Sequence, residues 1–378
     1  MIAAEVALSA VCLVMGGLLL ASFVHLIHVD KGFQADRAMV VGLALPRASY
    51  PDSESHVRFV RRLVARVEAL PGVVAAGVSN RGPLSGEGSN LGIDIDRSGD
   101  KADHPVVDYR CVTPGFFRAI GIPLVSRRLI AESDRDHPVA VVSSLTARRL
   151  WPGQDPLGKR FRLGGDFDIE VVGVVGDVRS TLQKDPSMTV YLPFWQRERQ
   201  VFSLHVRTAM DSLSIANAVR AEIRRLDPGL VVPRLQTLDA IVDASLAQRR
   251  FQLTLVLVFA LAPLLLASIG VYGVVSQSVA QRTNEIGIRM ALGAGRADVW
   301  KLVARHGLMP VLGGLCAGLA GAGATARLLS GFLFGVRAGD PATFGAVALV
   351  LLAAACAACG VPALRAARVD PLVALRYE

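Results

Sequence analysis

Long apolar runs alternate with one long polar stretch along this chain. Three runs hold almost no charge, Val6–Leu26, Phe251–Val275 and Thr343–Ala363, and a fourth, His306–Leu329, is interrupted only by Arg327. Each run approaches the roughly 20 apolar residues that a helix needs to cross a bilayer. The pattern predicts four transmembrane helices, and it excludes a purely soluble protein, a disordered chain and a small disulfide scaffold.

The polar stretch between the first two runs mixes helical and strand-like periodicities. Val57–Leu70 has apolar positions at helical spacing and stops at Pro71-Gly72, and residues 211–225 repeat the pattern. Ser143–Leu150 is expected to be a short helix capped by its serine. β-Branched or apolar runs predict buried strands at 73–78, 139–142, 161–163 and 170–175. The expected fold class is therefore membrane α-helical, with a large α+β domain inserted between helices 1 and 2.

The expected domain order follows from these boundaries. We expect transmembrane helix 1 at 1–28, the inserted domain at 29–248, and a helical membrane domain at 249–378. Its helices are expected at about 251–276, 306–330 and 343–363, with a loop over 280–305. The first run lacks a basic start and a convincing cleavage site, so it is read as a retained helix and not a signal peptide.

Short loops predict the sidedness of the helices. The 280–305 loop carries several basic residues, the tail carries Arg365, Arg368 and Arg376, and the turn between the last two runs has only Arg337. Basic short loops stay in the cytoplasm. We therefore expect a multi-pass membrane protein with both termini cytoplasmic and residues 29–248 extracytoplasmic.

Small residues line the third run, where Gly314 and Gly318 form a GxxxG pair. Such pairs let membrane helices approach closely. Two readings stay open, packing within the four-helix unit and a seam between two copies. Pro263 in the second run is read either as a hinge or as a tolerated residue.

Candidate catalytic chemistry is weak throughout the chain. Gly153–Lys159 matches seven positions of a phosphate-binding loop, but Arg160 stands where serine or threonine should bind magnesium, and a strand follows instead of a helix. GxSxG and HExxH motifs are absent. We predict no catalytic residue, no cofactor and no ATP hydrolysis by this chain.

Metal, redox and nucleic-acid roles are also not expected. His25 and His28 have ligand-compatible spacing but lack partners in sequence, and the Cys356–Cys359 pair lies in an alanine-rich run without charged neighbours. The formal charge is +9, yet the inserted domain mixes both signs and does not interleave aromatics with basic runs. We predict no metal site and no nucleic-acid partner.

The loop after the second run is the most informative segment. Residues 281–292 read as a short amphipathic helix in which Glu285 precedes Arg289 by four positions, the favoured direction for a helical ion pair. Gly293-Ala294-Gly295 ends it. The spacing fits either a membrane-surface helix held by anionic lipid or a docking element for a cytoplasmic partner.

Several motifs resemble those of the FtsX-like, MacB-type ABC transporter permease family. Val279–Ala294 and Leu364–Glu378 are similar to its permease signature and C-terminus, and Val112–Pro123, Trp151–Arg160 and Val172–Val178 are similar to the MacB-like periplasmic core domain. The segments 5–9 and 245–251 look most like the C-terminal half of a duplicated orphan permease of the acidobacterial type. Because the chain starts almost directly at the first run, we expect it to be the C-terminal half of a duplicated permease, or a split or truncated version of one.

The resemblance implies a permease that transmits ATP-driven closure of a separate cytoplasmic ABC ATP-binding subunit to the external domain, for efflux or export. Implied partners are that subunit, a second permease unit (a second copy or the other half of a duplicated permease), a periplasmic adaptor and membrane lipid. The implied location is the bacterial inner membrane. The alternatives are a signalling scaffold that acts on an extracytoplasmic protein and an orphan half without an ATPase. The coupling positions carried over from the family are Arg282, Glu285, Ile286, Gly287, Arg289, Met290, Gly293 and Ala294.

Overall fold

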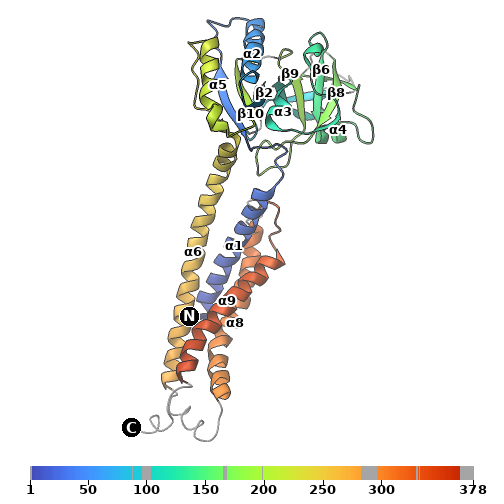
Figure 1. Ribbon diagram of the computed structural model, residues 1–378. Coiled ribbons are helices and arrows are strands. Elements are labelled where there is room, and N and C mark those ends of the chain that lie inside the picture. Colours follow the sequence, from blue (N-terminus) through green and yellow to red (C-terminus); the bar gives the residue numbers. More distant parts are fainter. Residues whose placement is uncertain are drawn as a thin grey trace. The chain divides into compact units, whose positions relative to one another are not determined.

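A computed structural model describes residues 2–86, 88–95, 104–164, 168–197, 199–281, 296–328, 331 and 333–366 (Figure 1). The chain divides into two compact units. Met1–His28 and Ala247–Glu378 form the helical unit, and Val29–Leu246 forms the inserted domain. The α+β domain thus lies between the first and second long helices.

Four long helices carry the apolar runs: α1 (Ile2–His28), α6 (Leu238–Gln281), α8 (Arg296–Leu328) and α9 (Pro341–Ala366). All four are long and apolar enough to cross a membrane. The second helix begins well before the expected start at 251. The Thr237 hydroxyl accepts a hydrogen bond from the Ala240 N–H at 3.1 Å and so caps α6. From there α6 continues through Arg249, Arg250 and Pro263.

The helical unit has its own apolar core. Helix α1 packs against α8 and α9, and α8 packs against α9. The buried face of α1 repeats at helical spacing, and it meets apolar side chains of the other three helices. The α1 residues in this core are Val6, Ala10, Val14 and Leu18.

The first half of the inserted domain is an antiparallel sheet, called the open sheet below. Its strand order is β11 (Gln236–Thr237), β1 (Ala38–Ala44), β10 (Val201–Thr208) and β2 (Val73–Ser79). Helix α2 (Ser53–Glu68) contacts β2, and α5 (Ser212–Leu226) contacts both α2 and β10. Asp52 caps α2 by accepting a hydrogen bond from the Ser55 N–H at 2.7 Å.

The second half is a closed ring of six short strands. In order around the ring they are β4 (Val106–Val112), β3 (Asn90–Asp94), β7 (Arg160–Leu163), β8 (Ile169–Val175), β6 (Val139–Ser143) and β9 (Thr189–Pro193), and β9 pairs with β4 to close it. The edge strand β5 (Leu124–Arg127) pairs with β8. Closure removes the exposed sheet edges that the ring strands would otherwise present.

Two short α-helices and a turn of 3₁₀ helix (Glu132–Asp134) complete the described part of the inserted domain. Helix α4 (Ser144–Leu150) follows β6, and the Ser143 hydroxyl accepts from the Thr146 N–H at 3.3 Å. Helix α3 (Phe116–Ile120) follows β4 and contacts β2 and β10. The helices predicted at 57–70, 143–150 and 211–225 are confirmed. The strands predicted at 73–78, 139–142, 161–163 and 170–175 are also confirmed.

Candidate functional site

The predicted coupling positions, Arg282 through Ala294, lie outside the residues that the structure describes. Their flanks are described. Helix α6 ends at Gln281 and α8 begins at Arg296, so a long helix stands on each side of the loop. Residues 282–295 therefore connect two long apolar helices, one of which runs back to Leu238.

The GxxxG glycines of α8 face α1 of the same chain. A Cβ at Gly318 would lie 2.6 Å from the Ala10 Cβ, and a Cβ at Gly314 would collide with the Ala3 carbonyl oxygen of α1. Real Cβ atoms do not approach so closely, so only glycine permits this separation of the two helices. The neighbouring Gly313 has open space around it.

The turn after α8 is attached to α1. The Phe334 N–H donates to the Ser22 hydroxyl at 2.8 Å, and the rings of Phe334 and His25 lie 5.9 Å apart. The His28 Nδ1 atom lies 2.8 Å from the Val24 carbonyl oxygen. Across the described residues no group of three potential metal ligands comes together.

The segment Gly153–Lys159, which resembles a phosphate-binding loop in sequence, forms an exposed turn between α4 and β7. Gly153 and Gly158 both have positive φ, 70° and 72°. The Lys159 ammonium donates to Gln154 at 2.9 Å, within the turn itself. A strand follows the turn, where a nucleotide site would require a helix N-terminus.

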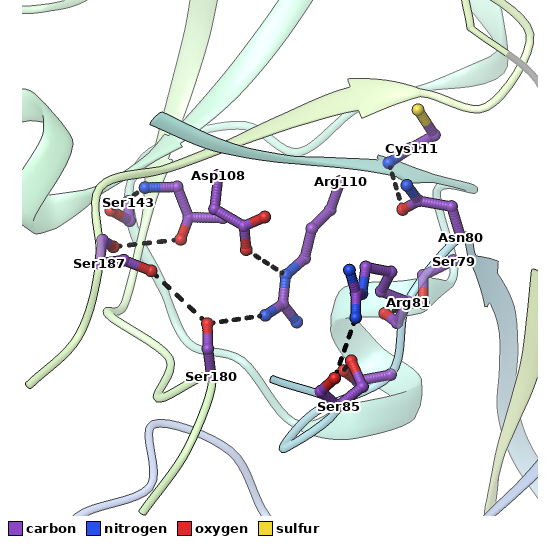
Figure 2. Close-up of polar contacts among 12 residues, drawn as sticks. Ser79, Asn80, Arg81, Ser85, Asp108, Arg110, Cys111, Ser143, Ser180 and Ser187 are labelled. Carbon is purple, nitrogen blue, oxygen red and sulfur yellow. Dashed lines mark hydrogen bonds and ion pairs between the residues drawn. The ribbon is translucent and has the colours of Figure 1, made fainter. Parts of the chain in front are cut away.

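A charged pair lies in the interior of the inserted domain (Figure 2). Asp108 and Arg110 project from the same face of β4 and are 3% and 1% exposed. Arg110 Nε lies 3.4 Å from Asp108 Oδ2, and Arg110 Nη2 lies 3.3 Å from the Ser180 hydroxyl. Among the described residues, Asp108 Oδ1 and Arg110 Nη1 have no hydrogen-bond partner. Burial raises the pKa of Asp108, and the nearby Arg110 guanidinium opposes that shift.

This ion pair can stabilise the fold, but it cannot act on a substrate. Both side chains are sealed from solvent, so a substrate cannot reach them. Through Ser180, the pair joins β4 to the segment that follows β8. A single long contact compensates the two buried charges only partly, which makes the pair sensitive to loss of either partner.

A buried serine–histidine contact also lacks the geometry of a nucleophile and its base. Ser79 Oγ lies 3.0 Å from His205 Nε2, but the Ser79 hydroxyl also donates to the Arg81 carbonyl. Both side chains are fully buried. Burial lowers the pKa of His205 to about 3, and the charge of Arg110 adds to the shift. No described group pairs with His205 Nδ1, so nothing orients the ring as a base.

A close backbone contact joins the two halves of the inserted domain. Thr113 bonds to β2 through its hydroxyl and its N–H, at 2.8 and 3.0 Å from the backbone N and O of Val78. A Cβ on Gly115 would collide with the Ala76 carbonyl, and one on Gly77 would collide with the backbone of Phe116. The motif at 112–123 was visible in the sequence, but its packing against β2 was not.

Comparison with known proteins agrees with this architecture. Residues 6–226 match the family model of the MacB-like periplasmic core domain, and residues 257–371 match that of the FtsX-like permease C-terminal domain. The chain belongs to the FtsX-like, MacB-type ABC transporter permease family. The first match covers most of α1 and the inserted domain as far as α5, and the second covers α6 from residue 257 together with α8 and α9.

Curated relatives carry the names of export proteins. The macrolide export ATP-binding/permease protein MacB of Azoarcus sp. is 29% identical over 68% of this chain and 40% of its own length. A MacB 2 of Aeromonas hydrophila is 30% identical over 70% of this chain and 42% of its length. The probable syringafactin export protein SyfD of Pseudomonas syringae is 28% identical over 71% and 42%. The chain therefore spans about two fifths of the length of these relatives.

Among solved structures, the periplasmic region of MacB from Actinobacillus actinomycetemcomitans aligns over 58% of this chain and 97% of its own. The sequence identity is 14% and the TM-score is 0.40. Each curated name joins an ATP-binding part to a permease, whereas the two models matched here describe a permease and a periplasmic domain.

Proposed function

We propose that this chain is the transmembrane permease subunit of an ABC export system. A separate ATPase would bind the 282–294 loop from the cytoplasm, and its ATP-driven closure would be transmitted to the inserted domain on the opposite side of the membrane. Two units are expected per assembly, because an ABC ATPase acts as a pair of protomers. The main support for this proposal is that one chain matches the family model of a periplasmic domain and, after it in sequence, that of a permease domain.

Helix α6 gives this proposal a physical route. It is continuous from Leu238 to Gln281, so its C-terminal end abuts the proposed coupling loop and its N-terminal end follows β11 of the inserted domain. A helix held at both ends transmits displacement along its axis. An ATPase that binds the loop better in one nucleotide state would shift the position of α6 between two states.

The small-residue contact between α8 and α1 supports the same route. Gly314 and Gly318 bring α8 against α1, the second helix that leads to the inserted domain. Movement at the start of α8 would therefore act on α1 through a packed contact as well as on α6 through the loop. Both helices that connect to the inserted domain are then under the control of one cytoplasmic element.

The test is affinity purification of the tagged chain from its native membrane in mild detergent, followed by mass spectrometry. We expect an ABC ATP-binding subunit to co-purify, and we expect Glu285→Lys to remove it. Asp136→Lys, at an exposed position of the inserted domain, is the matched control and should retain it. Recovery of an extracytoplasmic protein without any ATPase would contradict coupling and favour the signalling scaffold.

A further inference from the structure

A cavity of about 510 Å³ opens beside α2 in the inserted domain. Its walls come from α2, the turn that begins α3, the residues after β5, and the residues after β9. The lining is mainly apolar and includes Val57, Val60, Val64, Ile130, Phe194 and Trp195. This volume and this lining are typical of sites that enclose a small organic molecule.

The rim of this cavity, called the groove below, has an excess of positive charge. Three arginines line it, Arg61, Arg118 and Arg135, against the two glutamates Glu68 and Glu132. Arg135 is already committed, because its Nε lies 3.0 Å from Glu132 and its guanidinium lies 5.4 Å from the centre of the Trp195 ring.

The other two arginines are available to a ligand. Arg61 on α2 and Arg118 on α3 are exposed, and in the described part of the chain neither guanidinium has a hydrogen-bond or ion-pair partner. The Glu68 carboxylate instead accepts a hydrogen bond from the Ala76 N–H at 3.3 Å. Two free guanidinium groups from different elements thus border an apolar floor.

We propose that this groove binds an amphiphile that has an apolar chain and an anionic head group. Arg61 and Arg118 hold the head group, because the guanidinium fork matches the geometry of carboxylate and phosphate oxygens. The apolar chain of the amphiphile lies on Val64, Ile130 and Trp195 and removes their apolar surface from water. An uncharged or cationic amphiphile of the same length gains the apolar contact but not the ion pairs.

The site is independent of the proposed coupling to an ATPase, so the two can fail separately. The probe is dodecanoate carrying a photoactivatable diazirine at mid-chain, applied to the full chain in nanodiscs of zwitterionic lipid without ATP. We expect mass spectrometry to find labelled peptides that contain α2, residues 129–135 and residues 194–195. Unlabelled dodecanoate should compete, whereas 1-dodecanol and dodecyltrimethylammonium should compete about tenfold less well or worse.

Two variants separate the head-group contact from the apolar contact. Arg61→Gln combined with Arg118→Gln should reduce groove labelling about tenfold. Arg62→Gln, on the neighbouring exposed position of α2 outside the lining, should leave it unchanged. Ala65→Trp, at an exposed lining position, should block labelling by filling the groove without altering the unfolding temperature.

Three results would overturn the proposal. The first is labelling confined to the membrane helices. The second is equal competition by all three head groups. The third is undiminished labelling of the Arg61→Gln/Arg118→Gln variant.

Discussion

The hydroxyl oxygen of Thr113 accepts a hydrogen bond from the Val78 N–H at 2.8 Å, while the Thr113 N–H donates to the Val78 carbonyl at 3.0 Å. This double contact places the turn after β4, which belongs to the ring, against β2, which belongs to the open sheet. The two halves of the inserted domain are thereby fixed by backbone groups and not only by side-chain packing.

Replacing Gly115 by alanine should loosen this junction. The added Cβ would collide with the Ala76 carbonyl oxygen, which is backbone and cannot move alone. Overpacking of this kind costs about 1–3 kcal/mol. We expect a lower unfolding temperature for the inserted domain, measured by near-ultraviolet circular dichroism of the full chain in detergent. Gly42→Ala is the control, because an added Cβ there meets open space; equal effects of the two would refute the argument.

Substitution of Gly318 by valine should separate α8 from α1. A Cβ there would already lie 2.6 Å from Ala10, so the helices must move apart and lose contact along their length. The expected cost is about 1–3 kcal/mol. Gly313→Val is the control, because a Cβ at Gly313 meets open space and the substitution should be tolerated. The measurement is the monodisperse fraction after heating in detergent, and a tolerated Gly318→Val would show that the packing is not needed.

The buried pair Asp108–Arg110 should show strong coupling between substitutions. Arg110→Met leaves Asp108 buried without its ion-pair partner, although the charge of Arg81 still acts on it. Loss of one partner of a buried pair costs up to about 3–5 kcal/mol. The double variant Asp108→Leu/Arg110→Met removes both charges and should recover most of the lost stability. Unfolding of the two single variants and the double variant completes the cycle. Additive losses in the double variant would mean that the two charges do not interact.

His205 should make the inserted domain sensitive to acid. Its pKa is lowered to about 3 in the folded state, mainly by burial, while the unfolded chain titrates near 6.5. The unfolded state therefore binds a proton that the folded state cannot. Stability should fall as pH drops below about 6.5 and continue to fall toward pH 3, by up to about 1.4 kcal/mol per pH unit. His205→Gln should flatten this dependence, and an unchanged slope would assign it to other groups.

Lys159 should have no role in ATP hydrolysis despite its place in a phosphate-loop lookalike. Its ammonium contacts Gln154 in the same exposed turn, and β7 follows directly. We expect Lys159→Ala to leave the ATPase activity of the purified complex unchanged, measured as phosphate release. A large loss would mean that this turn binds nucleotide after all.

The membrane helices and the amphipathic elements could be predicted because their sequence patterns are local. The apolar runs, the spacing in Val57–Leu70 and the cap at Ser143 each reveal an element without knowledge of its neighbours. Strand β4 could not be predicted in this way, because Asp108 and Arg110 interrupt its apolar pattern. Charged residues normally indicate a solvent-facing position, and only the partner segments explain their burial.

The candidate sites, too, could be predicted only in part from local sequence patterns. The GxxxG spacing of Gly314 and Gly318 was visible, but which helix they pack against depends on the tertiary fold. The groove beside α2 was not visible, because Arg61 and Arg118 are 57 positions apart (118 minus 61) in the sequence. They become neighbours of one cavity only when α3 folds back onto the open sheet.

Transmission of ATP-driven movement to the inserted domain is the central claim, and hydrogen–deuterium exchange of the co-purified complex tests it most directly. Exchange would be compared between the nucleotide-free state and the state trapped with ATP and vanadate. We predict altered exchange at residues 236–246, where β11 leads into α6, and no alteration in a complex carrying Glu285→Lys. Unchanged exchange throughout the inserted domain of the wild-type complex would contradict the account.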